Sequence, residues 1–515
     1  MSDVPETRAE VPLVLGWRIS KDLHPQYWLE PGPGPGRQAP EDLVRVPPSR
    51  MACHTGILAQ SGAGKSFLLG RMIEELLLET RARCVVFDSN GDFLRVHEVK
   101  PETLWTECQY DSRTGLGRLP HEARRESFER RWRRVSTRIR TMRDEAETPY
   151  ERLRIPWTSI SPDFLAEELE PKCRSELHLC HRFVQLIAQI GHDVPSAVQP
   201  LARRMHPGRG LLDVAEELLR HGRNLNEQER IQLIQSHPRL RGAFDDAQRA
   251  ASGEDTSIVG RLYRNSRVVR LAEEAVRALR HVSADVERYY LNVARERGDS
   301  GFIDTELGVG QDHSLPEGRL DVIDLASLPD RRSRLMAVNA LLRWEWRQST
   351  KRWEKALKGP AEGDRRAPTF IVVDEAHILV PSAPRSRTEE AIREEFRTIA
   401  AEGRKYGMFL VLATQRPDKV DPYVLSEFEN MAVMRIGASA VRRAVESLPA
   451  LDGVPPRLLE KCVEFGPGRA LLAGRWVEGE PRFMYCAARR TVEGGRDLRA
   501  EWWASMPQEA PEAVA

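Results

Sequence analysis

The sequence predicts an α/β protein whose mainly parallel sheet is interrupted by a large all-helical insertion. Three observations predict this fold class. Runs typical of buried strands alternate with helical segments over residues 51–100, the same alternation returns over residues 317–490, and charged helical patterns fill residues 101–316 between them. Strands that alternate with helices usually pair in parallel, so we expect the two outer regions to form one core.

The composition is that of a globular protein. The chain has 515 residues, of which 41% are hydrophobic and 30% are charged, and its net charge is +1. No apolar run approaches the roughly 20 residues that span a bilayer, and the N-terminus lacks the pattern of a secretory signal, so we expect a cytoplasmic protein with no membrane contact. Because the net charge is close to zero, nucleic acid would have to bind at local basic patches.

The seven cysteines are scattered and odd in number, which favours free thiols in a reducing compartment. Cys173, His178, Cys180 and His181 lie close together in the sequence, but no Cys-x-x-Cys pair completes a zinc pattern. We interpret this segment as a helix, with positions 173, 180 and 181 on one buried face.

Residues 1–50 are predicted to be a short N-terminal segment ahead of the core. Residues 11–17 and 26–29 could be strands, and the alternating proline and glycine residues of 30–36 indicate a linker or an exposed turn. We expect the core to begin near Met51.

The most informative stretch is Ala59-Gln-Ser-Gly-Ala-Gly-Lys-Ser66, which follows an apolar run and opens the helical pattern of residues 65–79. Strand, glycine-rich turn and helix form the context of a phosphate-binding loop, because small residues let backbone N–H groups surround a phosphate at a helix N-terminus. Ala59 holds a place where glycine is usual, but two glycines of the loop still supply backbone freedom. Lys65 is expected to reach the β- and γ-phosphates, and the Ser66 hydroxyl is expected to ligate Mg²⁺. The residues expected to bind the nucleotide are Ser61, Gly62, Ala63, Gly64, Lys65, Ser66 and Phe67.

Two acids follow the next predicted strand, residues 83–88. Asp88 ends that strand and Asp92 closes the polar turn after it. Ligands of open α/β sheets bind at the carboxyl ends of the strands, so both acids lie where a phosphate or Mg²⁺ site is expected. The alternative is that they only cap the turn.

Within residues 101–316, the candidate helices are 122–143, 162–191, 211–221, 227–236 and 257–296. The first candidate is very basic, with arginines at 124, 125, 130, 131, 133, 134, 138, 140 and 143. These arginines could contact a phosphate backbone or an acidic partner. The alternative is a solvated helix whose arginines pair with Glu122, Glu126 and Glu129.

The α/β pattern resumes with a strand at residues 319–324 and a long helix over about 330–357. The run from Pro368 to Val373 then predicts a central strand that ends in the acids Asp374 and Glu375. Asp374 suits a role in holding the waters of Mg²⁺. Glu375 suits the general base that polarises an attacking water.

A helix over residues 388–402 and a strand over 408–413 come next. Gln415 follows that strand, where it could hydrogen-bond the γ-phosphate and act as a sensor. Either Arg404 or Arg416 could be an arginine finger that reaches the nucleotide of a neighbouring subunit, although a surface ion pair is the alternative for both. The remaining predicted elements are helices at 422–429, 439–448 and 455–463, strands at 431–436, 469–474 and 482–488, and a C-terminal tail over 491–515.

Together, these landmarks resemble the HerA branch of the FtsK–HerA superfamily of hexameric DNA-pumping ATPases. The matching pieces, in the same order and spacing, are residues 54–66, 86–92, 320–325, 372–377, 403–407 and 413–417. The Asp-Glu-Ala-His form of residues 374–377 favours the HerA branch over the FtsK branch. Two departures are that residues 1–50 are too few for the family's N-terminal β-barrel and that the helical insertion is long.

The resemblance implies a RecA-like P-loop core that uses ATP and Mg²⁺. By that likeness, Lys65 and Ser66 bind the nucleotide and metal, and Glu375 pairs with Asp88 in the hydrolytic site. Arg404 looks like the trans-acting finger, with Arg416 the weaker candidate, and Gln415 looks like the sensor. The implied activity is that of a ring, expected to be a hexamer, that translocates on double-stranded DNA and powers a partner nuclease in repair or in defence against foreign DNA.

Two other functions stay open. The chain could be a nucleotide-gated regulatory scaffold that recruits an effector protein through its helical insertion without moving DNA. It could also be a small-molecule kinase, but that function leaves Arg404, Gln415 and the chain length without a role.

Overall fold

The computed structural model describes most of the two predicted core regions and parts of the segment between them. The described residues are 10–19, 43–101, 121–143, 149–156, 160, 161, 164, 171–192, 211–222, 225–237, 270–278, 282, 286, 288–291, 293, 303, 304, 319–357, 366–437, 448–477 and 480–494.

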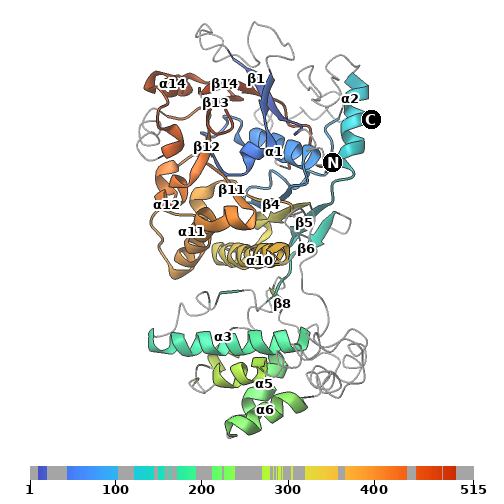
Figure 1. The fold of residues 1–515 in the computed structure, drawn as a ribbon, viewed down its shortest axis with the longest axis vertical. Helices are drawn as coiled ribbons and strands as arrows, with labels where there is room; N and C mark the ends of the chain where they lie inside the picture. The colour runs from blue at the N-terminus through green and yellow to red at the C-terminus, as the bar shows by residue number, and fades with distance from the viewer. Residues whose placement is uncertain are drawn as a thin grey trace, which may run out of the picture.

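One 12-stranded sheet organises the core (Figure 1). Its strands, in spatial order, are β2 (Leu43–Val46), β1 (Leu13–Arg18), β14 (Arg482–Cys486), β13 (Arg469–Gly474), β12 (Phe428–Val433), β3 (His54–Leu58), β11 (Met408–Thr414), β10 (Thr369–Val373), β4 (Arg83–Asp88), β9 (Leu320–Asp324), β5 (Thr137–Thr141) and β6 (Tyr150–Arg152). All pairs from β12 to β6 are parallel, and the pairs from β2 to β12 are antiparallel. The predicted α/β class with a mainly parallel sheet is confirmed.

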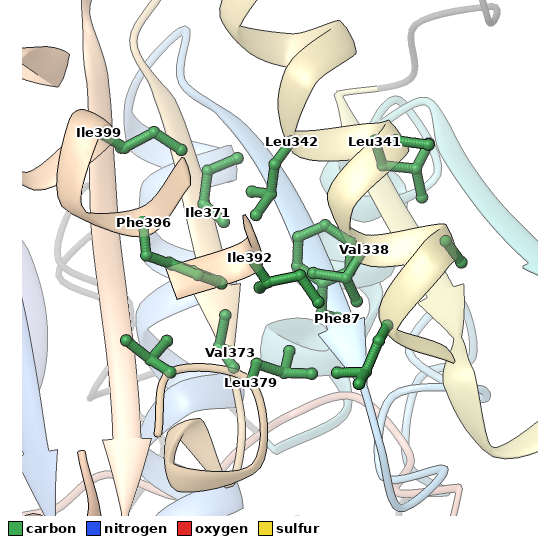
Figure 2. Packing of buried hydrophobic residues seen from close by; sticks show 14 of the residues in the cluster. Phe87, Val338, Leu341, Leu342, Ile371, Val373, Leu379, Ile392, Phe396 and Ile399 are labelled. Carbon is green, nitrogen blue, oxygen red and sulfur yellow. The ribbon is translucent and has the colours of Figure 1, made fainter. Parts of the chain in front are cut away.

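Helices cover both faces of the parallel strands, which is why those strands are continuous apolar runs. On one face, α10 (Arg331–Leu357) and α11 (Arg387–Tyr406) pack on side chains that include Phe87, Ile371 and Val373 (Figure 2). On the other face, α1 (Lys65–Glu79) packs on the alternate residues of the same strands, such as Val86 and Val372. This double cover fixes the strand ends that carry the predicted site.

The sheet extends to the N-terminal side of Met51, where the sequence predicted a short segment with a possible strand at residues 11–17. The structure confirms that strand as β1. β1 pairs with β14, and β2 pairs with β1. The buried middle of α1 completes this part of the sheet, because Glu75 Oε2 accepts the Val14 N–H at 2.8 Å and Arg71 Nε donates to the Val14 carbonyl at 3.0 Å. The possible strand at residues 26–29 lies outside the described residues.

The prediction of an all-helical segment over residues 101–316 is wrong for its first part. The basic helix is α2 (His121–Trp132) and ends eleven residues before position 143, because Thr137, Ile139 and Thr141 form β5 beside β9 instead. Alternating β-branched residues favour a strand there. Arg140 is drawn into the core as the ion-pair partner of the buried Asp321, at 3.3 Å. Two further short strands, β7 (Ile155–Pro156) and β8 (Ile303–Asp304), pair with each other.

A helical unit follows, on the side of α10 that faces away from the sheet (Figure 1). Its helices α3 (Pro171–His192), α5 (Leu211–Gly222) and α6 (Glu227–Ser236) confirm three predicted helices with shifted ends. The predicted helix 257–296 is helical at 270–278, and much of the rest of it lies outside the described residues.

The cysteine and histidine cluster forms no metal site. Cys180 and His181 are buried in α3, and the His181 ring bonds the Tyr290 hydroxyl at 2.8 Å, while burial lowers the pKa of His181 to about 3. In the described part of the chain, no group of three or more His, Cys, Asp or Glu side chains is arranged to hold a metal ion.

The C-terminal elements follow the prediction closely. They are α12 (Pro422–Ser426), β12, α14 (Pro456–Lys461), β13 and β14. The predicted helix at 439–448 and most of the predicted tail lie outside the described residues. None of the helices that the structure describes is long and apolar enough to cross a membrane.

Candidate functional site

The predicted phosphate loop joins β3 to α1 at the carboxyl end of the parallel strands. Its glycines are required by the backbone, since φ is +72° at Gly62 and +98° at Gly64, which caps α1. The Ala63 carbonyl accepts the Gly468 N–H at 2.9 Å, so the loop after α14 holds this turn from outside. Ala59 is fully buried, has no positive φ, and donates its N–H to the Thr414 carbonyl at 3.1 Å. Alanine therefore serves there as well as glycine.

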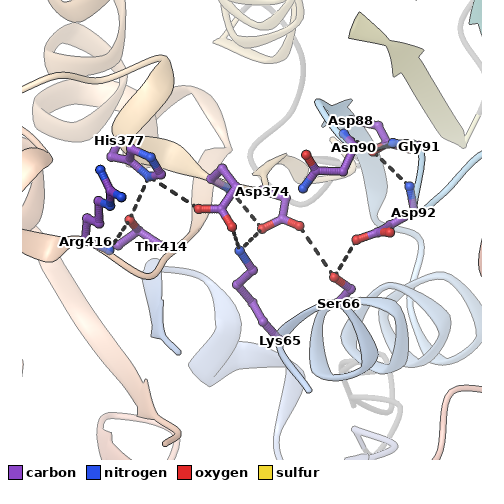
Figure 3. Close-up of polar contacts among 11 residues, drawn as sticks. Lys65, Ser66, Asp88, Asn90, Gly91, Asp92, Asp374, His377, Thr414 and Arg416 are labelled. Carbon is purple, nitrogen blue, oxygen red and sulfur yellow. Dashed lines mark hydrogen bonds and ion pairs between the residues drawn. The ribbon is translucent and has the colours of Figure 1, made fainter. Parts of the chain in front are cut away.

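The structure brings the loop and the predicted acid pair together (Figure 3). Lys65 Nζ lies 2.7 Å from Asp374 Oδ1 and also forms an ion pair with Glu375 Oε1. Burial alone would lower the pKa of Lys65, but the two carboxylates outweigh it and raise that pKa above its ordinary value. The lysine and both acids, predicted from stretches some 300 residues apart, thus share one half-buried site.

Glu375 has the backbone conformation of a special position. It is the only non-glycine residue with positive φ in the described chain, at +56°, a conformation that costs about 1–2 kcal/mol. Asp374 Oδ1 accepts the Glu375 N–H at 2.8 Å and supports this turn. The second carboxylate oxygen, Oε2, lies 3.3 Å from His377 Nδ1 and has no hydrogen-bond partner. An acid held in a strained backbone, with one oxygen unbonded, is suited to accept a proton from a bound water.

Asp88, which ends β4, and Asp92, which closes the turn after it, make different contacts. Both oxygens of Asp88 accept backbone N–H groups, from Gly91 and Phe93 at 2.8 Å and from Asn90 and Asp92 at 3.2 Å. Burial raises the pKa of Asp88 to about 6 despite these bonds. The Asp88 carboxylate therefore shapes the turn, and its pairing with Glu375 in hydrolysis stays a prediction.

Asp92, rather than Asp88, reaches the phosphate loop. Ser66 Oγ donates to Asp92 Oδ2 at 2.6 Å and lies 3.5 Å from Asp374 Oδ2. These three groups present only oxygen atoms, the ligands that Mg²⁺ prefers. The sequence predicted a phosphate or Mg²⁺ site where Asp92 lies, but it did not single out Asp92 as a metal-binding residue.

A segment near the C-terminal end of the described chain holds the turn that carries Asp92. The Asp92 carbonyl accepts Arg489 Nη1 at 3.1 Å and the Gly494 N–H at 3.2 Å. Arg489 is fully buried, with its guanidinium 4.8 Å from the centre of the Phe93 ring. A Cβ atom at Gly70 would lie 2.3 Å from Arg489 Cδ, so the glycine in α1 leaves the space that the Arg489 side chain occupies.

The remaining predicted residues lie at two ends of β11. Gln415 and Arg416 follow its carboxyl end beside the site, and the Arg416 N–H bonds Thr414 Oγ1 at 3.0 Å. Arg404 lies at the opposite end, in the last turn of α11, which precedes β11. Seven strand residues, about 20 Å, separate Arg404 from the phosphate loop of its own chain. The structure therefore does not bring Arg404 into the site that Lys65 and Glu375 form.

Two side chains flank the opening of the loop. Phe67, predicted to bind nucleotide, is 40% exposed, and Lys100 Nζ lies 4.7 Å from the centre of its ring. Arg435, which the sequence reasoning missed, places Nη2 3.4 Å from the Ser61 carbonyl. The available signal was its position, two residues after a strand that neighbours β3.

The comparisons with known proteins agree with the HerA resemblance. Residues 44–184 match the family described as "Helicase HerA, central domain". The DNA double-strand break repair helicase HerA of Sulfolobus acidocaldarius is 27% identical over 162 residues, which are 31% of this chain and 30% of that protein. The HerA of Pyrococcus furiosus is 26% identical over 184 residues, or 32% of each chain. The matched region thus spans about a third of the length of these relatives.

Among solved structures, the plasmid coupling protein TrwB in complex with a non-hydrolysable GTP analogue has a TM-score of 0.38 at 11% identity, covering 94% of this chain and 97% of that chain. The genome packaging NTPase B204 of Sulfolobus turreted icosahedral virus 2, in complex with ATP-gammaS, has a TM-score of 0.22 at 15% identity, covering 32% of this chain and 67% of that chain.

Proposed function

We propose, from the premise that this chain is a HerA-like P-loop protein, that it is an ATP-hydrolysing ring motor that translocates on double-stranded DNA. One observation carries the proposal. Lys65 and Ser66 meet Asp374 and Glu375 at one edge of the sheet, whereas the predicted finger, Arg404, lies at the other edge. A site divided in this way becomes complete only when a second subunit supplies its arginine.

The oxygen donors beside the loop fit Mg²⁺. Ser66 would hold the metal directly, and Asp374 and Asp92 would hold it or its waters, while the nucleotide phosphates supply further oxygens. When bound, Mg²⁺ would neutralise charge on the β- and γ-phosphates. The N-terminus of α1, which begins at Lys65, would face the same anion.

Nucleotide binding has to rearrange the Lys65 ion pairs. In the structure, Lys65 neutralises Asp374 and Glu375, and a bound triphosphate would compete for the same ammonium. Transfer of Lys65 to the phosphates would leave Glu375 free to accept the proton of an attacking water. His377 and Thr414, joined at 3.3 Å, are placed to hold the Glu375 side chain, since His377 Nδ1 also lies 3.3 Å from Glu375 Oε2. Gln415, which follows β11 directly, would sense the γ-phosphate.

The geometry of Arg404 supports a ring. Arg404 is 68% exposed, and its nearest carboxylate, Glu429 Oε1, is 3.9 Å away, so the guanidinium is available to a neighbouring molecule. A closed ring of identical contacts, with six subunits as the expected number, would give every nucleotide one such arginine. A nuclease that acts on the translocated DNA is the partner we propose, in repair or in defence against foreign DNA.

The regulatory scaffold is the second candidate, because the arginines of α2 are largely engaged within the chain. Arg125 and Arg133 pair with Glu129 at 3.3 and 2.5 Å, and Arg131 pairs with Glu79 at 2.5 Å. This is the arrangement expected of a solvated helix. Neutralising Arg130, Arg133 and Arg134 together tests the DNA role of α2. If this helix contacts DNA, the salt dependence of binding falls by about one slope unit per lost phosphate contact.

The decisive experiment measures ATP hydrolysis with and without duplex DNA, together with the particle mass in the presence of ATP. We expect an oligomer whose hydrolysis rate rises when DNA is added. A persistent monomer whose hydrolysis ignores DNA would contradict the motor. An ATP-dependent oligomer that ignores DNA would favour the scaffold.

A further inference from the structure

Arg435 is positioned by the backbone directly beside the phosphate loop. It follows β12, the parallel neighbour of β3, and the pairing continues past the strand ends. The Met434 N–H donates to the Leu58 carbonyl at 2.8 Å, and the Gln60 N–H donates to the Arg435 carbonyl at 2.7 Å. Arg435 is therefore fixed at the level where the chain leaves β3 and enters the loop.

The Arg435 guanidinium lies over the exposed tip of that loop. Nη2 is 3.4 Å from the Ser61 carbonyl, and a Cβ atom built at Gly62 would lie 3.7 Å from it. Among the residues that the structure describes, no carboxylate lies within ion-pair distance of Arg435, and the Ser61 contact is the only hydrogen bond of its side chain. A cation with one long bond to a carbonyl is easily transferred to a stronger acceptor, such as a phosphate oxygen.

The charge balance of the site leaves a role for such a cation. Among the side chains that the structure describes, Lys65 is the only lysine or arginine paired with these acids; it faces Asp374 and Glu375, while Asp92 adds a third carboxylate. A nucleoside triphosphate brings more negative charge to the same place. Phosphoryl transfer depends mainly on positioning and on stabilising that charge, so a further cation at the loop tip would act where it is needed.

We propose that Arg435 is a phosphate-contacting residue that acts in cis: its guanidinium leaves the Ser61 carbonyl and donates to the terminal phosphate of the nucleotide bound to its own subunit. In this proposal, the loop tip, residues 61 and 62, faces the terminal phosphate, and Phe67, after the start of α1, faces the nucleoside. The inference rests on the proposed nucleotide chemistry of this site, but it requires neither DNA translocation nor a partner nuclease.

The first test is the Arg435→Ala variant. We expect kcat to fall roughly 100-fold, the range found when one preorganised donor is removed from a charged transition state. Arg435→Lys should recover part of this loss because it keeps the charge. The matched control is Arg277→Ala, which removes an exposed arginine with the same kind of contact, a 3.4 Å bond to the Glu273 carbonyl, in the helical unit. Wild-type kcat and KM in Arg435→Ala would overturn the proposal.

A binding measurement keeps the test independent of turnover. Arg435→Ala should weaken the affinity for a non-hydrolysable ATP analogue by about tenfold and leave the affinity for ADP unchanged, because ADP lacks the terminal phosphate. Equal affinities of variant and wild type for both nucleotides would overturn the role of Arg435 even if the wild type hydrolysed nothing. A DNA-independent enzyme that still loses kcat in Arg435→Ala would refute the motor and leave this inference intact.

A complementation experiment separates cis from trans action. Lys65→Ala subunits cannot hydrolyse ATP themselves but still offer Arg404 to a neighbour. Co-expressed with Arg404→Ala subunits, they should restore part of the activity, because intact sites then meet intact fingers. Co-expressed with Arg435→Ala subunits, they should restore none, because one site lacks its lysine and the other lacks its own Arg435. Recovery in this second mixture would show that Arg435 acts in trans and would overturn the proposal.

Discussion

At the carboxyl end of the parallel strands, charged side chains are drawn together and half-buried, whereas at the opposite end Arg404 extends into solvent. Lys65, Asp374 and Glu375 satisfy one another at the first end. At the second end, Arg404 and Arg475 share Glu429, at 3.9 and 3.0 Å, and all three side chains are exposed. Residues that act within a chain are preorganised by that chain, whereas a residue that acts on a neighbour has to stay accessible.

The largest loss of activity is expected when the exposed Arg404 is removed. Arg404→Ala should lower kcat on the order of 10⁴-fold, as expected for the loss of an arginine finger, and leave ATP affinity nearly unchanged. Steady-state hydrolysis and nucleotide binding measure the two effects. Arg475→Ala is the matched control, since it removes the other partner of Glu429. Equal losses in both variants would mean that charge balance at this edge, rather than a finger, controls the rate.

The next largest loss of activity is expected from a substitution of Glu375, at the carboxyl end of the strands. Glu375→Gln should lower kcat on the order of 10³-fold, because the amide cannot accept the proton of the attacking water. ATP should still bind, and the protein should accumulate with ATP bound. Glu464→Gln, at an exposed position, serves as the control. Unchanged turnover in Glu375→Gln would refute the assignment of the general base.

A buried histidine at the first position of β3, the end of the strand opposite the phosphate loop, predicts a pH dependence of stability. The His54 ring accepts the Leu410 N–H at 2.9 Å through Nδ1, and Nε2 lies 3.0 Å from the Ala400 carbonyl. Burial lowers the pKa of His54 from its ordinary value of 6.5 to about 4. Because the unfolded chain binds this proton more readily, the contribution is fully present above pH 6.5 and is lost as the pH falls towards 4.

The size of this contribution is roughly 3 kcal/mol in the free energy of unfolding. Denaturant unfolding at pH 7.5 and at pH 5 should show a larger loss for the wild type than for His54→Gln, which has no group that titrates in this window. The same acid dependence in both proteins would show that His54 does not keep its low pKa.

The smallest effect on activity is expected from a substitution in the turn that carries Asp92. Asp92→Asn keeps an acceptor for Ser66 but removes the charge, so the Mg²⁺ concentration that gives half-maximal hydrolysis should rise about tenfold. Asp452→Asn, at an exposed position near α14, is the control. No shift in the Mg²⁺ requirement of Asp92→Asn would mean that this carboxylate only positions the serine.

The sequence was sufficient where each motif is local. The loop at 59–66 and the strand ending in Asp374 and Glu375 could be assigned because each pattern needs only its own neighbours, and parallel strands bring their carboxyl ends to one edge. The contact of Lys65 with both acids follows because the loop and the acids lie at the carboxyl ends of strands in the same parallel sheet. The HerA resemblance and the α/β class were predicted on the same grounds and are confirmed.

What the sequence could not give depends on contacts between distant segments. Asp88 and Asp92 lie in one short turn, and only the path of that turn decides which carboxylate faces Ser66. The sequence predicted a helix where β5 forms, because the arginines between Thr137, Ile139 and Thr141 are typical of a charged helix. The burial of these alternate residues depends on the pairing of β5 with β9. Arg435 belongs to no sequence motif, because its position beside the phosphate loop depends on the pairing of β12 with β3.

The contact between Arg489 and the Asp92 turn also has a consequence for how the protein is made. Chains emerge from the ribosome N-terminus first, and domains fold as their parts appear. The turn that faces Ser66 is held by Arg489 and Gly494, which are synthesised some 400 residues after it. A nascent chain that already contains the phosphate loop therefore lacks a fixed Asp92 turn until nearly the whole described core has been synthesised.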